Sequence, residues 1–214
     1  MTSSLTAGED GRANLVRVGD ATPLWTSAAG ASSNARPSIN GVAAHNGLVW
    51  TVNSGGQLQS WDPRAADAAP ATYRFVLDSG VDVVAHELHS IDISAAGMIA
   101  CGTNTGAVQI WDVKKLKYPQ KYVEAHTAEV WAVKYHPTLE NHMFSASENG
   151  SLLHWYTDSN TDHEFTDGDP TVVDILADKD CLGVNCCDVE DELVACGTDR
   201  ETLTIFNPMF SRDN

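Results

Sequence analysis

Basic residues are scarce in this chain. Its 214 residues include 13 Lys and Arg against 29 Asp and Glu, which gives a formal net charge of -16. Nucleic-acid-binding proteins need a basic footprint that neutralises phosphates, and anionic membrane surfaces attract basic segments for the same reason. The composition therefore predicts no direct contact with nucleic acid. The one local basic cluster, Lys114, Lys115, Lys117 and Lys121, is expected to lie in a solvated loop, because a nucleic-acid site needs a broader patch.

Long apolar runs are absent as well. No stretch approaches the roughly 20 apolar residues of a membrane-spanning helix, so no membrane insertion is expected. The first ten residues have neither the basic nor the apolar segment of a secretory signal. The five cysteines are odd in number and scattered, which fits a reducing compartment better than a disulfide framework. We therefore expect a soluble intracellular protein.

Motifs for catalysis and cofactor binding are also missing. The sequence has no phosphate-binding loop, dinucleotide fingerprint or paired-carboxylate site. The residues that could suggest zinc are Cys181, Cys186, Cys187 and His163. Structural zinc ligands come in closely spaced pairs such as C-x2-C, whereas the adjacent Cys186 and Cys187 would point to opposite faces of a strand. We expect no cofactor, no metal ion and no catalytic residue.

What the sequence does contain is an internal repeat. Five segments share a turn position, usually glycine, followed five residues later by a bulky apolar residue. The segments are Gly8–Val16, Asn53–Asp62, Thr103–Asp112, Ser147–Tyr156 and Thr198–Asn207. Repeats of this length indicate stacked or radially arranged supersecondary units.

Each repeat has the pattern of a β-hairpin. Gly11, Gly56 and Gly150 supply the positive φ that a tight two-residue turn requires. Apolar strands are predicted before the turns at Leu48–Val52, Met98–Cys101, His142–Ala146 and Leu193–Cys196, and an alternating strand follows, as at Ala107–Trp111. Further strands are predicted upstream at Ser90–Ile93, Val130–Tyr135 and Cys186–Val189, and at outer positions at Tyr73–Leu77 and Lys121–Val123. Four short antiparallel strands per unit are typical of a propeller blade, so the sequence predicts an all-β propeller of about four to five blades.

The dipeptides Trp61-Asp62 and Trp111-Asp112 resemble the signature of the WD-repeat family. In that family a His, a Ser or Thr, a turn Asp and the Trp form a hydrogen-bonded network inside each blade, and a buried indole N–H and imidazole do need partners. The resemblance assigns this structural network to His126, Ser147, Asn149 and Trp155 in one blade. It assigns His86, Thr103 and Trp111 to the preceding blade, with Thr105 in place of the turn Asp.

Several stretches resemble, more narrowly, the small WD-repeat nucleoporins of the Y-shaped scaffold complex of the nuclear pore. They are Gly8–Leu15, Thr51–Leu58, Ala125–Trp131, Ser147–Trp155 and Val194–Asp199. The resemblance implies a non-catalytic scaffold subunit that docks on helical scaffold nucleoporins at the nuclear envelope, and that in animals also visits kinetochores in mitosis. It also implies seven blades, of which this chain would lack about two at the N-terminal side.

The repeat predicts a single propeller over residues 1–214, incomplete at its N-terminus and not a complete folding unit alone. Residues 157–180 are predicted to form an acidic linker between blades; the part from Asp158 to Pro170 lacks calcium-loop spacing. A docking loop for a basic partner remains an alternative for it.

The sequence leaves three alternatives to the scaffold function. A catalytic pair of His126 and Ser147 is disfavoured, because no G-x-S-x-G elbow is present. An adaptor that presents substrates to a ubiquitin ligase is the main alternative, and a propeller hydrolase is a third.

Overall fold

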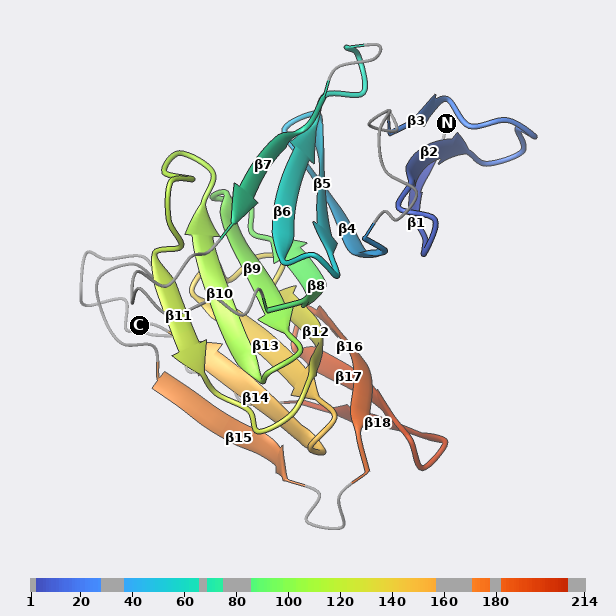
Figure 1. Cartoon of the computed structure of the whole chain (residues 1–214). Coiled ribbons are helices and arrows are strands. Elements are labelled where there is room, and N and C mark those ends of the chain that lie inside the picture. The colour runs from blue at the N-terminus through green and yellow to red at the C-terminus, as the bar shows by residue number, and fades with distance from the viewer. Residues whose placement is uncertain are drawn as a thin grey trace.

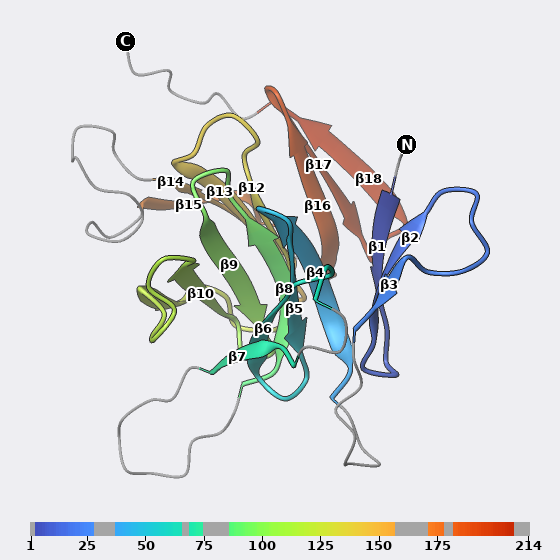
Figure 2. The ribbon, with the colours of Figure 1, turned by 90° about the horizontal axis from the view of Figure 1, so that it is seen from above.

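The computed structural model describes residues 3–27, 37–65, 69–74, 86–156, 171–177 and 182–207. Within these ranges the chain forms 18 β-strands in five antiparallel sheets, and no helix long and apolar enough to cross a bilayer occurs. Each sheet is built from strands that follow one another in the sequence, so each is a meander. The sheets are arranged around a common centre like blades, as Figures 1 and 2 show.

We label the sheets blades A to E in chain order. Blade A contains β1 (Ser3–Ala7), β2 (Ala13–Arg17) and β3 (Trp25–Thr26). Blade B contains β4 (Ile39–His45), β5 (Leu48–Asn53), β6 (Gln57–Trp61) and β7 (Ala71–Arg74). Blade C contains β8 (Leu88–Ile93), β9 (Met98–Thr103), β10 (Ala107–Asp112) and β11 (Lys121–Glu124). Blade D contains β12 (Val130–Tyr135), β13 (His142–Ser147), β14 (Ser151–Tyr156) and β15 (Thr171–Ala177), and blade E contains β16 (Val184–Glu190), β17 (Leu193–Thr198) and β18 (Thr202–Phe206).

The first strands of neighbouring blades pack side by side. β1 contacts β4, β4 contacts β8, β8 contacts β12, and β12 contacts β16. Figure 2 shows β4, β8, β12 and β16 at the inner side, with β7 and β15 further out. The inner strands of four successive blades, B to E, therefore lie next to one another.

Hydrophobic cores fill the spaces between blades. Between blades B and C, Trp111 packs with Trp50 and Leu58. Between blades C and D, Trp155 packs with Ile110 and Met143. A third core between blades D and E contains Phe144, Leu152, Val194 and Cys196. Because strand side chains point alternately to the two sheet faces, blades C and D each contribute to the cores on both of their sides.

The hairpin turns repeat one backbone conformation. Gly11, Gly56, Gly106, Gly150 and Glu201 occupy the same turn position, and all have positive φ, between 57° and 91°. In blades B to E the turn has three residues rather than the two predicted, with positive φ at the third. This is the geometry of a type I turn followed by a bulge, and it explains why a single positive-φ residue suffices.

The predicted all-β propeller is confirmed, with five sheets, three of which have four strands in the described ranges. Three strands are not predicted from the sequence: the short β3, the inner strand β4 and the outer strand β15. β15 falls inside the segment 157–180 that was predicted to be an acidic linker, so that prediction is wrong for Thr171–Ala177. Its sequence, TVVDILA, is rich in β-branched and apolar residues, which favour pairing along β14. The acidic residues 158–170 lie outside the described residues.

Candidate functional site

One rim of the propeller carries a repeated polar arrangement. In blades B to E, the first residue of the hairpin turn donates its backbone N–H to the carbonyl of a residue just before the inner strand. The pairs are Ser54 to Ser38, Asn104 to Glu87, Glu148 to Glu129 and Asp199 to Gly183, at 3.0 Å in every case. Each turn is thereby fixed against the start of the inner strand of its own blade.

A β-bulge occurs at the same place in all four inner strands. The pairing register skips one residue there, and the skipped residues are Asn40, His89, Trp131 and Asn185. A bulge re-aims the side chain of the extra residue. We call these four residues, together with the eight of the repeated hydrogen bonds, the rim.

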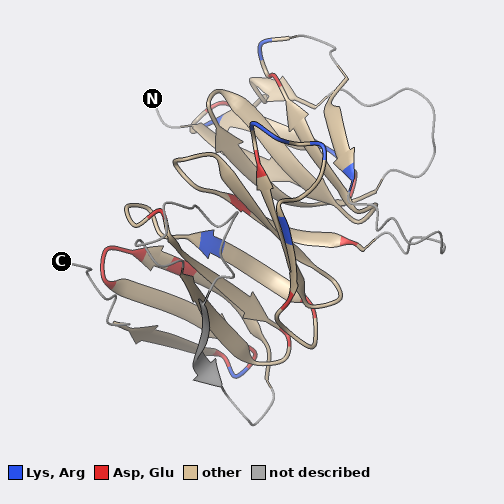
Figure 3. Cartoon of the chain, turned by 90° about the vertical axis from the view of Figure 1, so that its left-hand side faces the viewer, with Lys and Arg blue, Asp and Glu red and all other residues tan. Residues whose placement is uncertain are grey.

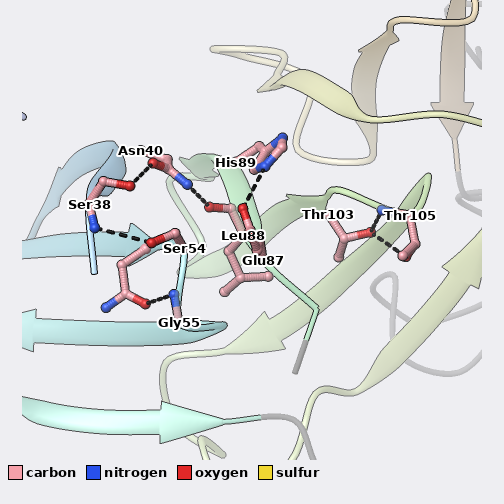
Figure 4. Close-up of polar contacts among 10 residues, drawn as sticks. Ser38, Asn40, Ser54, Gly55, Glu87, Leu88, His89, Thr103 and Thr105 are labelled. Atoms are coloured by element: carbon pink, nitrogen blue, oxygen red, sulfur yellow. Dashed lines mark hydrogen bonds and ion pairs between the residues drawn. The ribbon is translucent and has the colours of Figure 1, made fainter. Parts of the chain in front are cut away.

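In blades B and C the rim side chains bond to one another and across the blade boundary (Figure 4). The backbone N–H of Ser38 donates to Ser54 Oγ at 3.1 Å, and Ser38 Oγ donates to Asn40 Oδ1 at 3.0 Å. The amide of Asn40 then donates to the carbonyl of Leu88 in blade C at 2.9 Å. Blades C and D are also joined by a hydrogen bond: Ser90, the residue after the bulged His89, donates its Oγ to the carbonyl of Val130 at 3.0 Å.

In blades C and D the rim changes to aromatic and acidic residues. The rings of His89 and Trp131 are stacked with centroids 4.9 Å apart and an interplanar angle of 16°. The indole N–H of Trp131 donates to Glu148 Oε2 at 2.7 Å, and His89 Nε2 lies 3.5 Å from Glu87 Oε2. Trp131 is still 40% exposed, in contrast to Trp111 and Trp155, which are fully buried.

The rim is acidic, like the chain as a whole. It contains four carboxylates, from Glu87, Glu129, Glu148 and Asp199, and none of them pairs with a Lys or Arg side chain of the described residues. Figure 3 shows the wider pattern: on the side that it presents, Asp and Glu lie mostly in turns and near strand ends, and Lys and Arg are fewer. The rim therefore offers negative charge beside an exposed aromatic ring.

Beneath the rim, blade D contains a continuous hydrogen-bonded network. Trp155 Nε1 donates to Ser145 Oγ at 2.8 Å, and His126 Nε2 lies 2.7 Å from the same oxygen. His126 Nδ1 lies 2.7 Å from Ser151 Oγ, which donates to Asn149 Oδ1 at 2.6 Å. The network links the loop before β12 to the hairpin formed by β13 and β14.

The donors and acceptors of this network assign one tautomer to His126. The Ser151 hydroxyl gives its proton to Asn149, so His126 Nδ1–H must donate to Ser151 Oγ. Nε2 is then an acceptor for the Ser145 hydroxyl, whose oxygen also accepts from Trp155. Neutral imidazole satisfies every partner, and burial lowers the pKa of His126 to about 4, partly offset by hydrogen bonding to Asn149.

The structure puts Ser145, not Ser147, between His126 and Trp155. Ser147 lies two residues further along the same face of β13, where its hydroxyl donates to the carbonyl of Ala128 at 3.1 Å and accepts from the Asn149 N–H at 3.3 Å. Because residues two apart in a strand point to the same side, the sequence pattern alone fits both serines. Blade B repeats the observed geometry, since Trp61 Nε1 donates to Thr51 Oγ1 at 3.0 Å from the equivalent positions.

In blade C the three predicted residues do not form one network. Cys101 replaces the hydroxyl residue, and Trp111 Nε1 donates instead to Gln109 Oε1 at 3.2 Å. Thr103 closes the hairpin turn by bonding to the N–H and carbonyl of Ala107. His86 stands apart, with its ring 6.1 Å from that of Tyr122 and its Nδ1 buried without a hydrogen-bond partner among the described residues.

The histidines and cysteines of blades D and E are packed rather than arranged around an ion. His154 is stacked on Phe144 at 4.8 Å, and its Nε2 lies 2.7 Å from His142 Nδ1. Burial and the neighbouring histidines lower the pKa of His154 to about 4. Cys187 is buried while Cys186 is exposed, as expected for adjacent strand residues, and the described residues hold no group of three potential metal ligands. Cys181 and His163 lie outside the described residues.

Ser145 and His126 are at hydrogen-bonding distance, as in a nucleophile and its base. However, Ser145 is completely buried and His126 is 6% exposed, so no substrate can reach the hydroxyl. The Ser145 oxygen is already held by Trp155. This pair is therefore part of the blade interior and not an accessible nucleophile.

The meander order of the sheets and the contacts between their first strands define the class of protein by its fold: this is a β-propeller. The crystal structure of the Cps50 (Swd1) β-propeller domain from Myceliophteria thermophila matches with a TM-score of 0.75 at 12% identity, over 96% of this chain and 66% of that one. No protein-family model matches the chain.

The sequence itself is similar to the nucleoporin Nup43. Identity is 29% to Nup43 of Mus musculus and 28% to Nup43 of Homo sapiens, over 97% of this chain in both cases. A nuclear pore complex protein nup43 of Dictyostelium discoideum is 23% identical over 72% of this chain. The chain spans 62% of the length of the mouse and human relatives. It is thus a β-propeller whose sequence is similar to that of Nup43.

Proposed function

We propose that this chain is a scaffold subunit of the nuclear pore complex at the nuclear envelope. The similarity to Nup43 over 97% of the chain is the observation that carries the proposal. The fold suits the role, because neighbouring blades share hydrophobic cores and hold their turns in fixed positions. A rigid body with many loops can engage several partners without a large loss of conformational entropy.

The proposed partners are helical scaffold nucleoporins of the Y-shaped complex, with no direct contact with nucleic acid. A protein of net charge -16 repels polyanions, and the carboxylates of the rim contribute to its negative electrostatic potential. Association with mitotic kinetochores is proposed only as a property of the same complex. The protein is proposed to be non-catalytic, since the contact between His126 and Ser145 is buried inside blade D.

Proximity labelling with the tagged chain in living cells tests this function. Biotinylation of scaffold nucleoporins, in excess over a tagged WD-repeat protein of unrelated function, is the expected result. Enrichment of ubiquitin-ligase subunits without nucleoporins would instead support the adaptor function. It would overturn the proposal.

A further inference from the structure

We propose that the rim of blades C to E is a docking site for an arginine side chain of a partner protein. The site is formed by the stacked rings of His89 and Trp131 and by the carboxylates of Glu148 and Asp199. This inference rests on the proposed docking function. It specifies the location of one contact on the propeller and the type of partner side chain that binds there.

The aromatic part of the site is held in place from two sides. His89 covers one face of the Trp131 indole across the boundary between blades C and D. Glu148 Oε2 accepts the indole N–H at 2.7 Å and so fixes the direction of the ring. His89 itself is largely covered, with a side chain 12% exposed, whereas Trp131 is 40% exposed. A bulged residue that is this well oriented and yet exposed is suited to contact another molecule.

The acidic part of the site lies next to this ring. A Cβ placed on Gly183 would lie 2.8 Å from Glu148 Oε2 and 3.1 Å from Asp199 Oδ2, so the two carboxylates converge over this glycine. Asn185 donates to Asp199 Oδ1 at 2.5 Å and orients that carboxylate. Neither Glu148 nor Asp199 pairs with a Lys or Arg of the described residues. Two converging like charges without a counterion are relieved by an incoming cation.

Among cationic side chains, the geometry favours arginine over lysine. A guanidinium group is planar, stacks on an indole ring and donates several N–H groups in one plane to carboxylates. The site offers both features at adjoining positions, a ring from blade D and carboxylates from blades D and E. A lysine ammonium would gain the charge attraction but not the stacking.

The interaction can be measured with short peptides. We would titrate the 15N-labelled full chain with acetyl-Gly-Arg-Gly-amide and follow the indole N–H resonances, assigning that of Trp131 with the Trp131→Phe variant. The matched peptides carry lysine or citrulline, the latter being close to arginine in shape but uncharged. We expect the Trp131 signal to shift with arginine, less with lysine and not with citrulline. A largest shift at another Trp, or equal binding of citrulline, would overturn the inference.

Two variants separate a local site from the overall charge. Glu148→Gln removes the negative charge and keeps one acceptor oxygen for the Trp131 N–H. Glu124→Gln is the control, because it changes the net charge equally on the outer strand β11. We expect about three- to tenfold weaker binding of the arginine peptide to Glu148→Gln, with Glu124→Gln close to the unaltered chain. Equal weakening in both variants would overturn the local site. Thermal unfolding of each variant verifies that the blades remain folded.

The peptide titration and the proximity labelling together show which of the two proposals fails. If the chain labels nucleoporins but its Trp131 signal does not respond to arginine, only the rim site is wrong. If the peptide binds as expected while no nucleoporin is labelled, the rim site stands and the proposed function is wrong.

Discussion

Trp155 donates its indole N–H to Ser145 at 2.8 Å, and the same oxygen lies 2.7 Å from His126. The three residues come from β14, β13 and the loop before β12, so this one hydroxyl joins three segments of blade D. All three side chains are buried. A buried polar group that loses its partner costs about 1–3 kcal/mol, which makes the network the most sensitive polar feature of the blade.

The two serines of β13 should therefore respond differently to substitution. Ser145→Ala leaves the Trp155 N–H and His126 Nε2 without partners, and we expect it to lower the free energy of unfolding by about 2–4 kcal/mol. Ser147→Ala removes bonds to two backbone groups beside the turn and should cost about 1 kcal/mol. Urea unfolding of both variants checks this order, and a larger loss for Ser147→Ala would contradict the assignment of Ser145.

Trp155 is expected to be structural. It is fully buried in the core between blades C and D, and Trp155→Ala should cost about 3–5 kcal/mol. The control is Trp131→Ala, whose exposed ring should cost less than about 2 kcal/mol. Unchanged thermal stability of Trp155→Ala together with loss of partner binding would identify Trp155 as a surface anchor instead.

Glu201 offers a stabilising substitution. It has a φ of 57° at the turn position where the other blades have glycine. A side chain in this conformation is strained by about 1–2 kcal/mol, so Glu201→Gly should raise the free energy of unfolding by about 1 kcal/mol after the entropy cost of glycine. Glu190→Gly, in the strand β16, is the control and should destabilise. A destabilised Glu201→Gly variant would show that the turn is not strained.

Acid should destabilise the fold in a defined window. The pKa of His126 falls from 6.5 to about 4 on folding, chiefly because of burial, and His154 shifts in the same direction. Between these values the unfolded chain binds more protons, so stability is full above pH 6.5 and is lost as the pH falls towards 4, by on the order of 3 kcal/mol for His126. Burial raises the pKa of Asp92, which opposes the effect at the acid end.

The acid prediction is checked by measuring unfolding free energy against pH for the unaltered chain and for His154→Gln. The variant replaces one of the two contributing histidines, so its curve should be flatter between pH 6.5 and 4. A curve of unchanged slope in the variant would show that His154 binds its proton equally well in both states.

The propeller fold could be predicted from the sequence, because the turn position and the bulky residue after it recur in every repeat. The strand β4 was missed because the INGVAAH sequence of Ile39–His45 contains a glycine and few bulky residues, and its pairing depends on β5 and β8. The choice between Ser145 and Ser147 needed the structure, since both point to one face of β13.

The rim could not be predicted from the sequence either. Asn40, His89, Trp131 and Asn185 share no residue type, and only the repeated bulge brings them to one structural position. The exposure of Trp131 could not be told from that of Trp111 or Trp155 by residue type alone. What the sequence offered was the stretch Glu129–Trp131, where an acidic residue precedes an aromatic one at the start of a predicted strand.

The most direct test of the central claim is the location of the protein in interphase cells. The chain, tagged at its own locus and imaged by fluorescence together with a marker of the pore scaffold, should appear as a punctate ring at the nuclear envelope. Its spots should coincide with those of the marker. A diffuse distribution with no enrichment at the envelope, in cells where the marker forms a normal ring, would contradict the assignment to the nuclear pore.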